Sequence, residues 1–250
     1  MTETNLDKVM ALLAAIRAQD ADKVLQLVAP RFVQHTPYIA DGVEGLRQFI
    51  LDATSDQVKL SLVRAIADGQ LVVAQLRLES SGENRFAVFR FQNGLIAEQW
   101  AFSSPDAPPN ESGHTQLDSP TEPTDLADTD RNKAVVHKYY ETFHLAGNHD
   151  QNGEFFAGNL MIRHEPGVRD GLDEFLRDVK ILMQHRTIDE LRLLAGQGDL
   201  VFIAAKGAHE NDACAYIDLY RVEDEKIVEH WGFPQMFPPQ SVRMNPNSML

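Results

Sequence analysis

The chain has 250 residues, of which 37 are acidic and 23 are basic, and its formal net charge is −14. This length suits two domains of ordinary size, and the negative charge argues against nucleic acid as a partner, because phosphate backbones would be repelled. No apolar run approaches the length of a membrane-spanning helix, and the single cysteine, Cys214, excludes an intrachain disulfide, so we expect a cytoplasmic protein without membrane contact.

The first half of the chain predicts three helices followed by four strands. Apolar residues at helical spacing indicate a helix that begins near Leu6, Asp20 precedes a second helix over 21–28, and Asp41 is expected to cap a third. Alternating apolar residues predict strands over 58–66, 71–79, 86–91 and 95–102. Helices followed by an antiparallel sheet are typical of an α+β domain.

A polar segment rich in Pro, Ser, Thr, Asp and Glu separates the two halves of the chain. It runs from 103 to 130, and we expect its first part to be a tail that lies on the first domain. The predicted domains are therefore 1–118 and 131–250, joined by a linker over 119–130.

The second half repeats this order of elements. A helix is expected around Tyr139 and Tyr140, another helix after Asp170, and strands over 188–194, 200–208, 213–222 and 226–233. The closing hairpins of the two halves share five residues at one offset, which indicates an internal duplication. Arg90, Ile96, Glu98, Trp100 and Phe102 recur as Arg221, Ile227, Glu229, Trp231 and Phe233.

The second hairpin also predicts which side chains share a face of the sheet. Because side chains alternate along a strand, Asp218 should oppose Gly232 and Tyr220 should oppose His230, all on one face. Trp231 then lies on the other face, where we expect both hairpin tryptophans to pack at the interface between the domains.

His35-Thr36-Pro37, an Asp-Gly pair that opens a helix, and the strand Ile227-Val228-Glu229-His230-Trp231 together resemble the SnoaL-like polyketide cyclases. These belong to the nuclear transport factor 2-like superfamily, and the resemblance covers almost the whole chain twice, more closely in the second half. It implies tandem cone-shaped α+β domains, each with three helices packed in a curved antiparallel sheet around one mostly apolar pocket.

The resemblance also implies an assembly and a chemistry. Family members usually dimerise through their sheets, so the two halves could pair as an intrachain pseudo-dimer in a monomer, or the chain could form a homodimer. The characterised cyclases close rings by aldol condensation without metal or cofactor, and a pocket Asp acts as acid and base. That Asp commonly follows the hairpin Trp, where this chain has Ala101 and Gly232.

The inward face of the second hairpin supplies the alternative candidates. We expect Asp218 to be the general base, His230 its partner or the acid, and Tyr220 a hydrogen-bond donor to a carbonyl oxygen. The leading hypothesis is a cofactor-free cyclase, isomerase or lyase acting on a small apolar carbonyl compound. A non-catalytic small-molecule-binding protein and a pseudo-dimeric scaffold are the alternatives, since Asp218 and His230 could simply satisfy each other.

Further candidates for ligand contacts are His35 and His164, whose rings could either point into the pocket mouth or pin a turn, together with Val228, Phe89 and Gln99. The first domain carries no titratable residue at the positions that match the second, so its pocket should be filled or purely apolar. His35 has no second ligand at a metal-motif spacing, so neither a metal nor a cofactor is expected.

Overall fold

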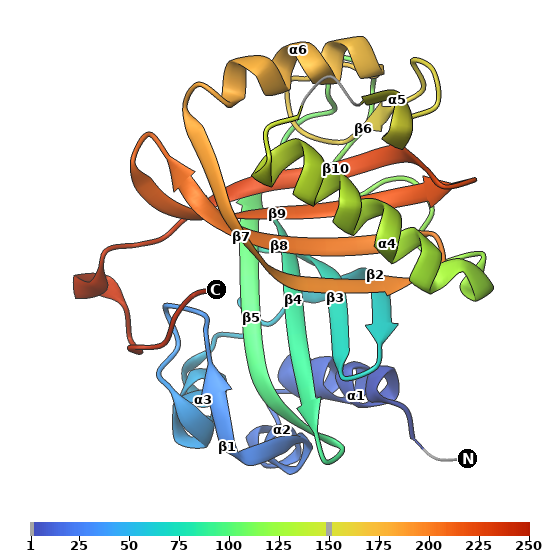
Figure 1. Cartoon of the computed structure of the whole chain (residues 1–250). Coiled ribbons are helices and arrows are strands. Elements are labelled where there is room, and N and C mark those ends of the chain that lie inside the picture. The colour runs from blue at the N-terminus through green and yellow to red at the C-terminus, as the bar shows by residue number, and fades with distance from the viewer. Residues whose placement is uncertain (1–2, 149–151) are drawn as a thin grey trace. The chain divides into compact units, whose positions relative to one another are not determined.

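The computed structural model describes residues 3–148 and 152–250, and the chain divides into two compact units. Unit 1 comprises Met1–Pro105 together with Pro238–Leu250, and unit 2 comprises Asp106–Phe237. Each unit contains one five-stranded sheet and its own helices (Figure 1).

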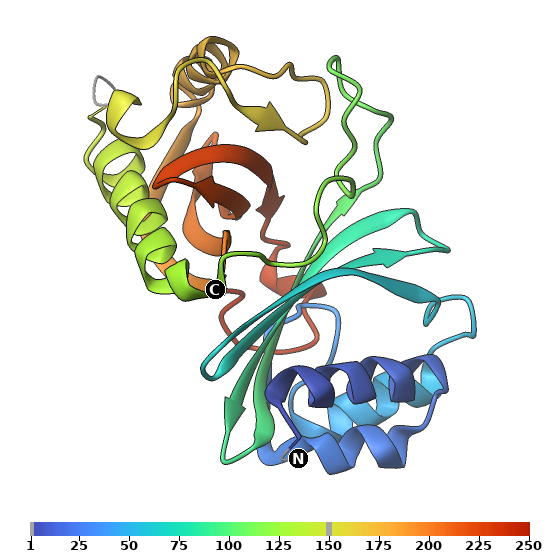
Figure 2. The same cartoon turned by 90° about the vertical axis from the view of Figure 1, so that its right-hand side faces the viewer.

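Unit 1 packs three helices on one face of its sheet (Figure 2). Its core joins the apolar faces of these helices to inward strand residues such as Phe89, because amphipathic elements bury their apolar sides together. The strands follow the order β1-β5-β4-β3-β2. The elements are α1 (Asn5–Arg17), α2 (Ala21–Leu27), β1 (Val28–Gln34), α3 (Gly42–Asp52), β2 (Leu60–Asp68), β3 (Leu71–Leu78), β4 (Glu83–Gln92), β5 (Leu95–Pro105) and, near the C-terminus, the short 3₁₀ helix η4 (Gln240–Val242).

Unit 2 has the same strand order, β6-β10-β9-β8-β7. Its first long helix continues as a π-helix, a form that often occurs at functional sites. The elements are the 3₁₀ helix η1 (Leu126–Asp128), α4 (Thr129–Tyr139), the π-helix η2 (Tyr140–Leu145), α5 (Asn152–Phe155), β6 (Ile162–Arg163), α6 (Leu172–Leu182), β7 (Arg186–Gln197), β8 (Leu200–His209), β9 (Asp212–Glu223) and β10 (Lys226–Met236).

The predicted α+β class and the succession of helices and sheet are confirmed, but the sheets are mixed rather than wholly antiparallel. β1 pairs with β5, and β6 with β10, in parallel. The sequence analysis missed β1 because Pro30 suggested a stop. Proline is tolerated there because β1 is an edge strand and need not donate on its free side.

A β-bulge sets the register of the closing hairpin in both units. In unit 2, Ile227 pairs with Val222 but Glu229 pairs with Arg221, so Val228 is the extra residue. Beyond the bulge, Asp218 opposes Gly232 and Tyr220 opposes His230, as predicted. Without the extra residue, every inward side chain of β10 would move to the other face.

Ala97 is the corresponding extra residue in unit 1, where Phe91 pairs with Ile96 and Arg90 with Glu98. The hairpin turns also agree in backbone conformation: both residues of each turn, Asn93-Gly94 and Asp224-Glu225, have positive φ. This is the twist that two-residue hairpins prefer.

The two polar tails lie in the units opposite to those expected. The segment after Asp106 was predicted to lie on the first domain, but it belongs to unit 2, where the Asn110 side chain donates to the Arg163 carbonyl at 2.7 Å. The last residues of the chain belong to unit 1, where the Asn247 side chain donates to the Gln34 carbonyl at 2.9 Å.

The predicted cap at Asp41 is also corrected, and Asp170, at the matching position before α6, behaves in the same way. Neither side chain caps the helix that follows it. Asp41 instead accepts a hydrogen bond from the Gln34 backbone at 2.9 Å, and Asp170 accepts one from the Arg163 backbone at 2.9 Å. Each carboxylate therefore joins the helix start to the preceding edge strand.

None of the helices in the described part of the chain combines the length and the apolarity needed to cross a membrane.

Candidate acid–base site

Unit 2 contains a cavity of about 420 Å³. Its floor is formed by inward residues of β9 and β10, including Asp218, His230 and Gly232, and α6 contributes to its wall. Ionisable side chains gather at one part of an otherwise apolar lining, an arrangement typical of small-molecule sites. The apolar part of the lining comprises Pro166, Val168, Ile181, Leu182, Phe233 and Pro234.

His230 lies between two carboxylates. Its Nε2 is 2.8 Å from Oδ1 of Asp218, and its Nδ1 is 2.9 Å from Oε1 of Glu165. The sequence predicted the first contact from the strand register. It missed Glu165, which follows β6 and reaches the site only because β6 pairs with β10.

These contacts decide the protonation of the imidazole. Burial opposes the charged form, but the carboxylates of Glu165 and Asp218 outweigh it and raise the pKa of His230 from 6.5 to about 9. Burial would raise the pKa of Glu165, yet His230 and Arg163 lower it to about 2. His230 is therefore an imidazolium at neutral pH.

Tyr140 also belongs to the site. Sequence analysis predicted only that this residue lies on a helix. Its hydroxyl donates to Oδ2 of Asp218, while His230 holds Oδ1. Tyr140 is the first residue of the π-helix, where the change of helical pitch sets the direction of the side chain. Burial, followed by the negative charge of Asp218, raises the pKa of this phenol well above its ordinary value.

Gly232 leaves the space that the Asp218–His230 pair occupies. A Cβ at this position would lie 2.6 Å from Oδ1 of Asp218 and 2.8 Å from Nε2 of His230. The position at which the resemblance to the cyclases implied an Asp is therefore adjacent to the carboxylate of the opposing strand.

Arg163, a further charged group near the pair, also has carboxylate partners. Arg163, on β6, lies 2.6 Å from a carboxylate oxygen of Asp178 and 3.3 Å from Glu165. Its guanidinium carbon lies 5.4 Å from the centre of the Phe175 ring, so α6 and β6 are joined at the cavity wall.

Tyr220 and Val228 lie away from the cavity. The Tyr220 ring stacks on His230 with centroids 4.7 Å apart, but it is 1% exposed and belongs to the core rather than to the cavity lining. Val228 is the bulge residue and does not line the cavity either.

His164 lies on the other face of β10. Its ring stacks on Trp231 with centroids 4.3 Å apart, its Nε2 is 2.7 Å from Glu229, and its Nδ1 donates to the Thr115 carbonyl at 2.7 Å. The side chain is fully buried. Of the two alternatives left open for this ring, the structure therefore has the one in which it contacts the backbone rather than the pocket mouth, and it fastens the tail of unit 2 to the sheet.

His35 makes the matching contacts in unit 1. It stacks on Trp100 with centroids 4.3 Å apart, its Nε2 lies 3.4 Å from Glu98, and its Nδ1 donates to the Ser248 carbonyl at 2.6 Å. It does not line the cavity of unit 1. The two tryptophans thus have a partner within their own unit, namely these imidazoles.

Unit 1 has a smaller cavity, of about 60 Å³, on the inward face of its sheet, besides a pocket of about 410 Å³ beside α3. Phe89 and Gln99 line the smaller cavity, as expected for ligand-binding candidates, together with Ala87 and Ala101. The expectation of a filled or purely apolar pocket is corrected, because Arg85 also lines this space. Burial lowers the pKa of Arg85, and Glu83 opposes that change.

One cluster could in principle bind a metal ion. His114, Asp118 and His164 bring possible ligand atoms within 4.8 Å of one another. The spacing did not reveal this group, because His164 lies far along the chain from the other two. Both ring nitrogens of His164 already contact Thr115 and Glu229, so the cluster fits a hydrogen-bonded tail better than a metal centre.

Comparisons with known proteins show which family model and which solved structures the chain is similar to. Residues 9–99 match the sequence model of the SnoaL-like domain family. No curated protein matches the chain. Among solved structures, a putative ketosteroid isomerase from Kribbella flavida is 13% identical, with 45% of this chain and 84% of that chain covered and a TM-score of 0.38.

Two other solved structures are similar at the same level. A putative polyketide cyclase from Acidithiobacillus ferrooxidans is 15% identical, covering 42% of this chain and 87% of its own, with a TM-score of 0.36. A protein of unknown function with a cystatin-like fold from Xanthomonas campestris is 22% identical, covering 41% and 89%, with a TM-score of 0.37. Each covers less than half of this chain, about the length of one unit.

Proposed function

We propose that unit 2 is a cofactor-free acid–base catalyst that moves a proton within a small, mostly apolar carbonyl compound, as an isomerase or a cyclase does. The observation that supports this most directly is the carboxylate of Asp218, which lines the cavity and is held by Tyr140 and His230. A fixed base beside an apolar surface is suited to removing a proton next to a carbonyl group.

In the proposed reaction, an oxygen of Asp218 takes a proton from the carbon next to the carbonyl. The C–H bond breaks, its electron pair moves into the enolate, and an O–H bond forms on Asp218. In an isomerisation the carboxylic acid returns this proton to another carbon of the same molecule. In a cyclisation the enolate carbon attacks a second carbonyl carbon, and Asp218 gives its proton to the new alkoxide.

His230 is a positioning residue in this scheme rather than the acid. Both of its ring nitrogens already contact carboxylates, one on Asp218 and one on Glu165. Its positive charge stabilises the ionised base before the proton is taken, and Glu165 balances that charge. We assign Tyr220 to holding the imidazole ring by stacking, since it lies outside the cavity lining.

We also infer that unit 2 is a second, diverged copy of the domain that the family model matches in unit 1. The shared strand order, the bulges at Ala97 and Val228, and the stacked His–Trp pairs of both units support this inference. The small cavity of unit 1 suits a structural role or the binding of a smaller ligand.

A second function is favoured by one observation. Both oxygens of Asp218 already accept hydrogen bonds, from Tyr140 and His230, which weakens a carboxylate as a base. The cavity would then bind a small molecule without converting it. The two functions differ in whether a bound ketone exchanges its hydrogens.

Proton exchange in D₂O tests the proposal without knowledge of the natural substrate. The probe is 2-tetralone, a bicyclic ketone of suitable size, and NMR follows the loss of its α-hydrogens. We expect the protein to accelerate exchange and Asp218→Asn to reduce that acceleration about 100-fold or more. Asp212→Asn, at the exposed start of the same strand, is the matched control and should exchange at the wild-type rate. Binding of the ketone without accelerated exchange would support the binding function instead.

A further inference from the structure

We propose that Arg186 forms an anion subsite of the unit 2 cavity, which binds the carboxylate of an otherwise apolar carbonyl compound. This inference rests on the proposed function and narrows its substrate class to carbonyl acids.

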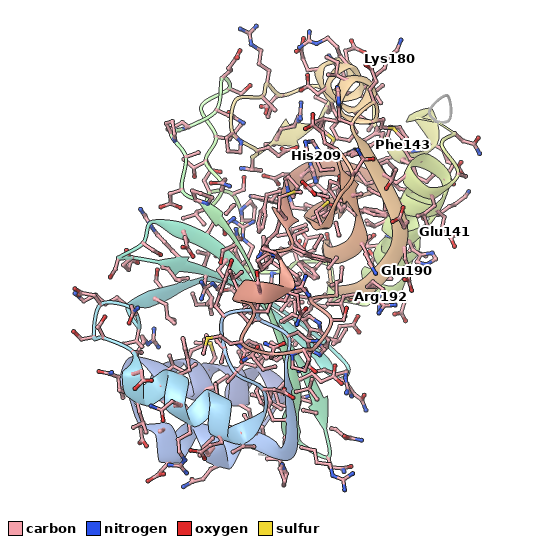
Figure 3. The ribbon with its side chains drawn as sticks, turned by 90° about the vertical axis from the view of Figure 1, so that its left-hand side faces the viewer. Glu141, Phe143, Lys180, Glu190, Arg192 and His209 are labelled. Atoms are coloured by element: carbon pink, nitrogen blue, oxygen red, sulfur yellow. The ribbon has the colours of Figure 1, made fainter. Side chains whose placement is uncertain are left out.

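Arg186 lies at the end of the sheet that borders the cavity. It is the first residue of β7 and pairs with His209, the last residue of β8, and both residues line the cavity. His209 is labelled in Figure 3. The guanidinium carbon of Arg186 lies over the Tyr216 ring, 5.4 Å from its centre. A guanidinium that covers an aromatic face keeps the N–H groups at its edge available for a planar partner.

Arg186 differs from the other charged groups that line the cavity because it has no counter-ion. Arg163 contacts Asp178 and Glu165, and His230 contacts Glu165 and Asp218. Within residues 3–148 and 152–250, no carboxylate lies at ion-pair distance from Arg186. A half-buried guanidinium beside apolar side chains lacks its preferred partner, and a carboxylate supplies one through two parallel hydrogen bonds.

The charge of Arg186 also acts on the catalytic part of the site. Burial raises the pKa of Tyr140 and Tyr220 well above their ordinary values, and the positive charge of Arg186 opposes this rise at both phenols. Its guanidinium therefore lies close enough to these phenols for its charge to act on them.

The strand geometry sets the spacing between the anion and the reacting carbon. Tyr216, beneath the guanidinium, and Asp218 are two residues apart on β9 and share one face, which separates them by roughly 7 Å. A substrate that contacts both Arg186 and Asp218 carries its carboxylate several bonds from the carbon that loses the proton. Apolar residues of the same lining, such as Pro234, which opposes Tyr216, suit a hydrocarbon body.

A pair of probes of equal size tests the subsite by binding alone. Isothermal titration calorimetry compares 2-naphthoate with the neutral ketone 2-acetylnaphthalene. The wild-type protein should bind the carboxylate about tenfold more tightly or more, where tenfold corresponds to about 1.4 kcal/mol. Arg186→Gln should abolish this preference, and Arg186→Lys, which keeps the charge but not the fork, should retain part of it.

The control is Arg192→Gln, on the same strand. Arg192 contacts Glu190 at 2.8 Å and does not line the cavity, so the preference should persist. Equal affinity for both probes in the wild type, no binding of 2-naphthoate, or a preference that survives Arg186→Gln would overturn the proposal. Asp218→Asn separates the two proposals, because it should abolish exchange while keeping the preference for the anion.

Discussion

The buried imidazolium of His230 should make the stability of unit 2 depend on pH. The side chain is 8% exposed, and its pKa is raised from 6.5 to about 9, because the carboxylates of Glu165 and Asp218 outweigh the cost of burial. One pH unit corresponds to 1.36 kcal/mol, so the difference between 6.5 and about 9 is equivalent to about 3 kcal/mol.

The direction in which the free energy of unfolding changes with pH follows from the number of protons bound in each state. Between pH 6.5 and 9 the native state holds a proton on His230 that the unfolded state has lost, so the free energy of unfolding falls as pH rises. The full contribution is present below pH 6.5 and is lost as pH passes through about 9. His230→Gln removes the titrating group, so the difference in stability between wild type and variant should be about 3 kcal/mol larger at pH 6 than at pH 9.5.

Urea unfolding at these two pH values measures the difference, and NMR of the histidine Cε1–H resonances reports the midpoint of His230 directly. His185→Gln is the control, because His185 is exposed and outside the cavity. Its effect should stay within about 0.5 kcal/mol at both pH values. A His230 resonance that titrates at or below pH 6.5, or a stability difference that does not change with pH, would refute the reasoning.

Two other substitutions test the packing around the site and around His164 in unit 2. Gly232→Ala places a Cβ within 2.8 Å of Asp218 and His230, so it should destabilise the protein by about 1–3 kcal/mol and move the His230 NMR midpoint toward 6.5. Glu229→Gln removes the carboxylate that contacts His164 and Arg221, and should lower the free energy of unfolding by about 3 kcal/mol in urea titrations.

Each of these two substitutions has a control substitution elsewhere in the chain. Gly69→Ala is the glycine control, because a Cβ at this turn meets nothing within 4 Å, and it should leave the His230 midpoint unchanged although its positive φ strains the turn. Glu98→Gln makes the corresponding change in unit 1, where the carboxylate is 22% exposed, so its cost should be about 1 kcal/mol or less. Equal costs for Glu98 and Glu229, or a normal midpoint in Gly232→Ala, would contradict the assigned geometry.

Local pattern alone determined much of the hairpin that carries the site. Alternation along β9 and β10 predicted that Asp218 and His230 share a face and that Trp231 points the other way, and the structure has this arrangement. Residues two apart on a strand must share a face, so the prediction needs no knowledge of distant contacts. The repeat of five residues at one offset likewise anticipated two sheets with the same strand order.

Tertiary structure alone decided the groups that surround this pair. Glu165 follows β6, Tyr140 begins the π-helix and Arg186 begins β7, and nothing in their local sequence indicates that they meet beside β9. The same holds for the tail that covers His164, which the sequence analysis assigned to the first domain although it belongs to unit 2. Periodicity specifies which side chains share a face of an element. The groups that pack against that face depend on contacts between residues far apart in the chain. The charge of His230 depends on these groups, because the carboxylates beside it raise its pKa.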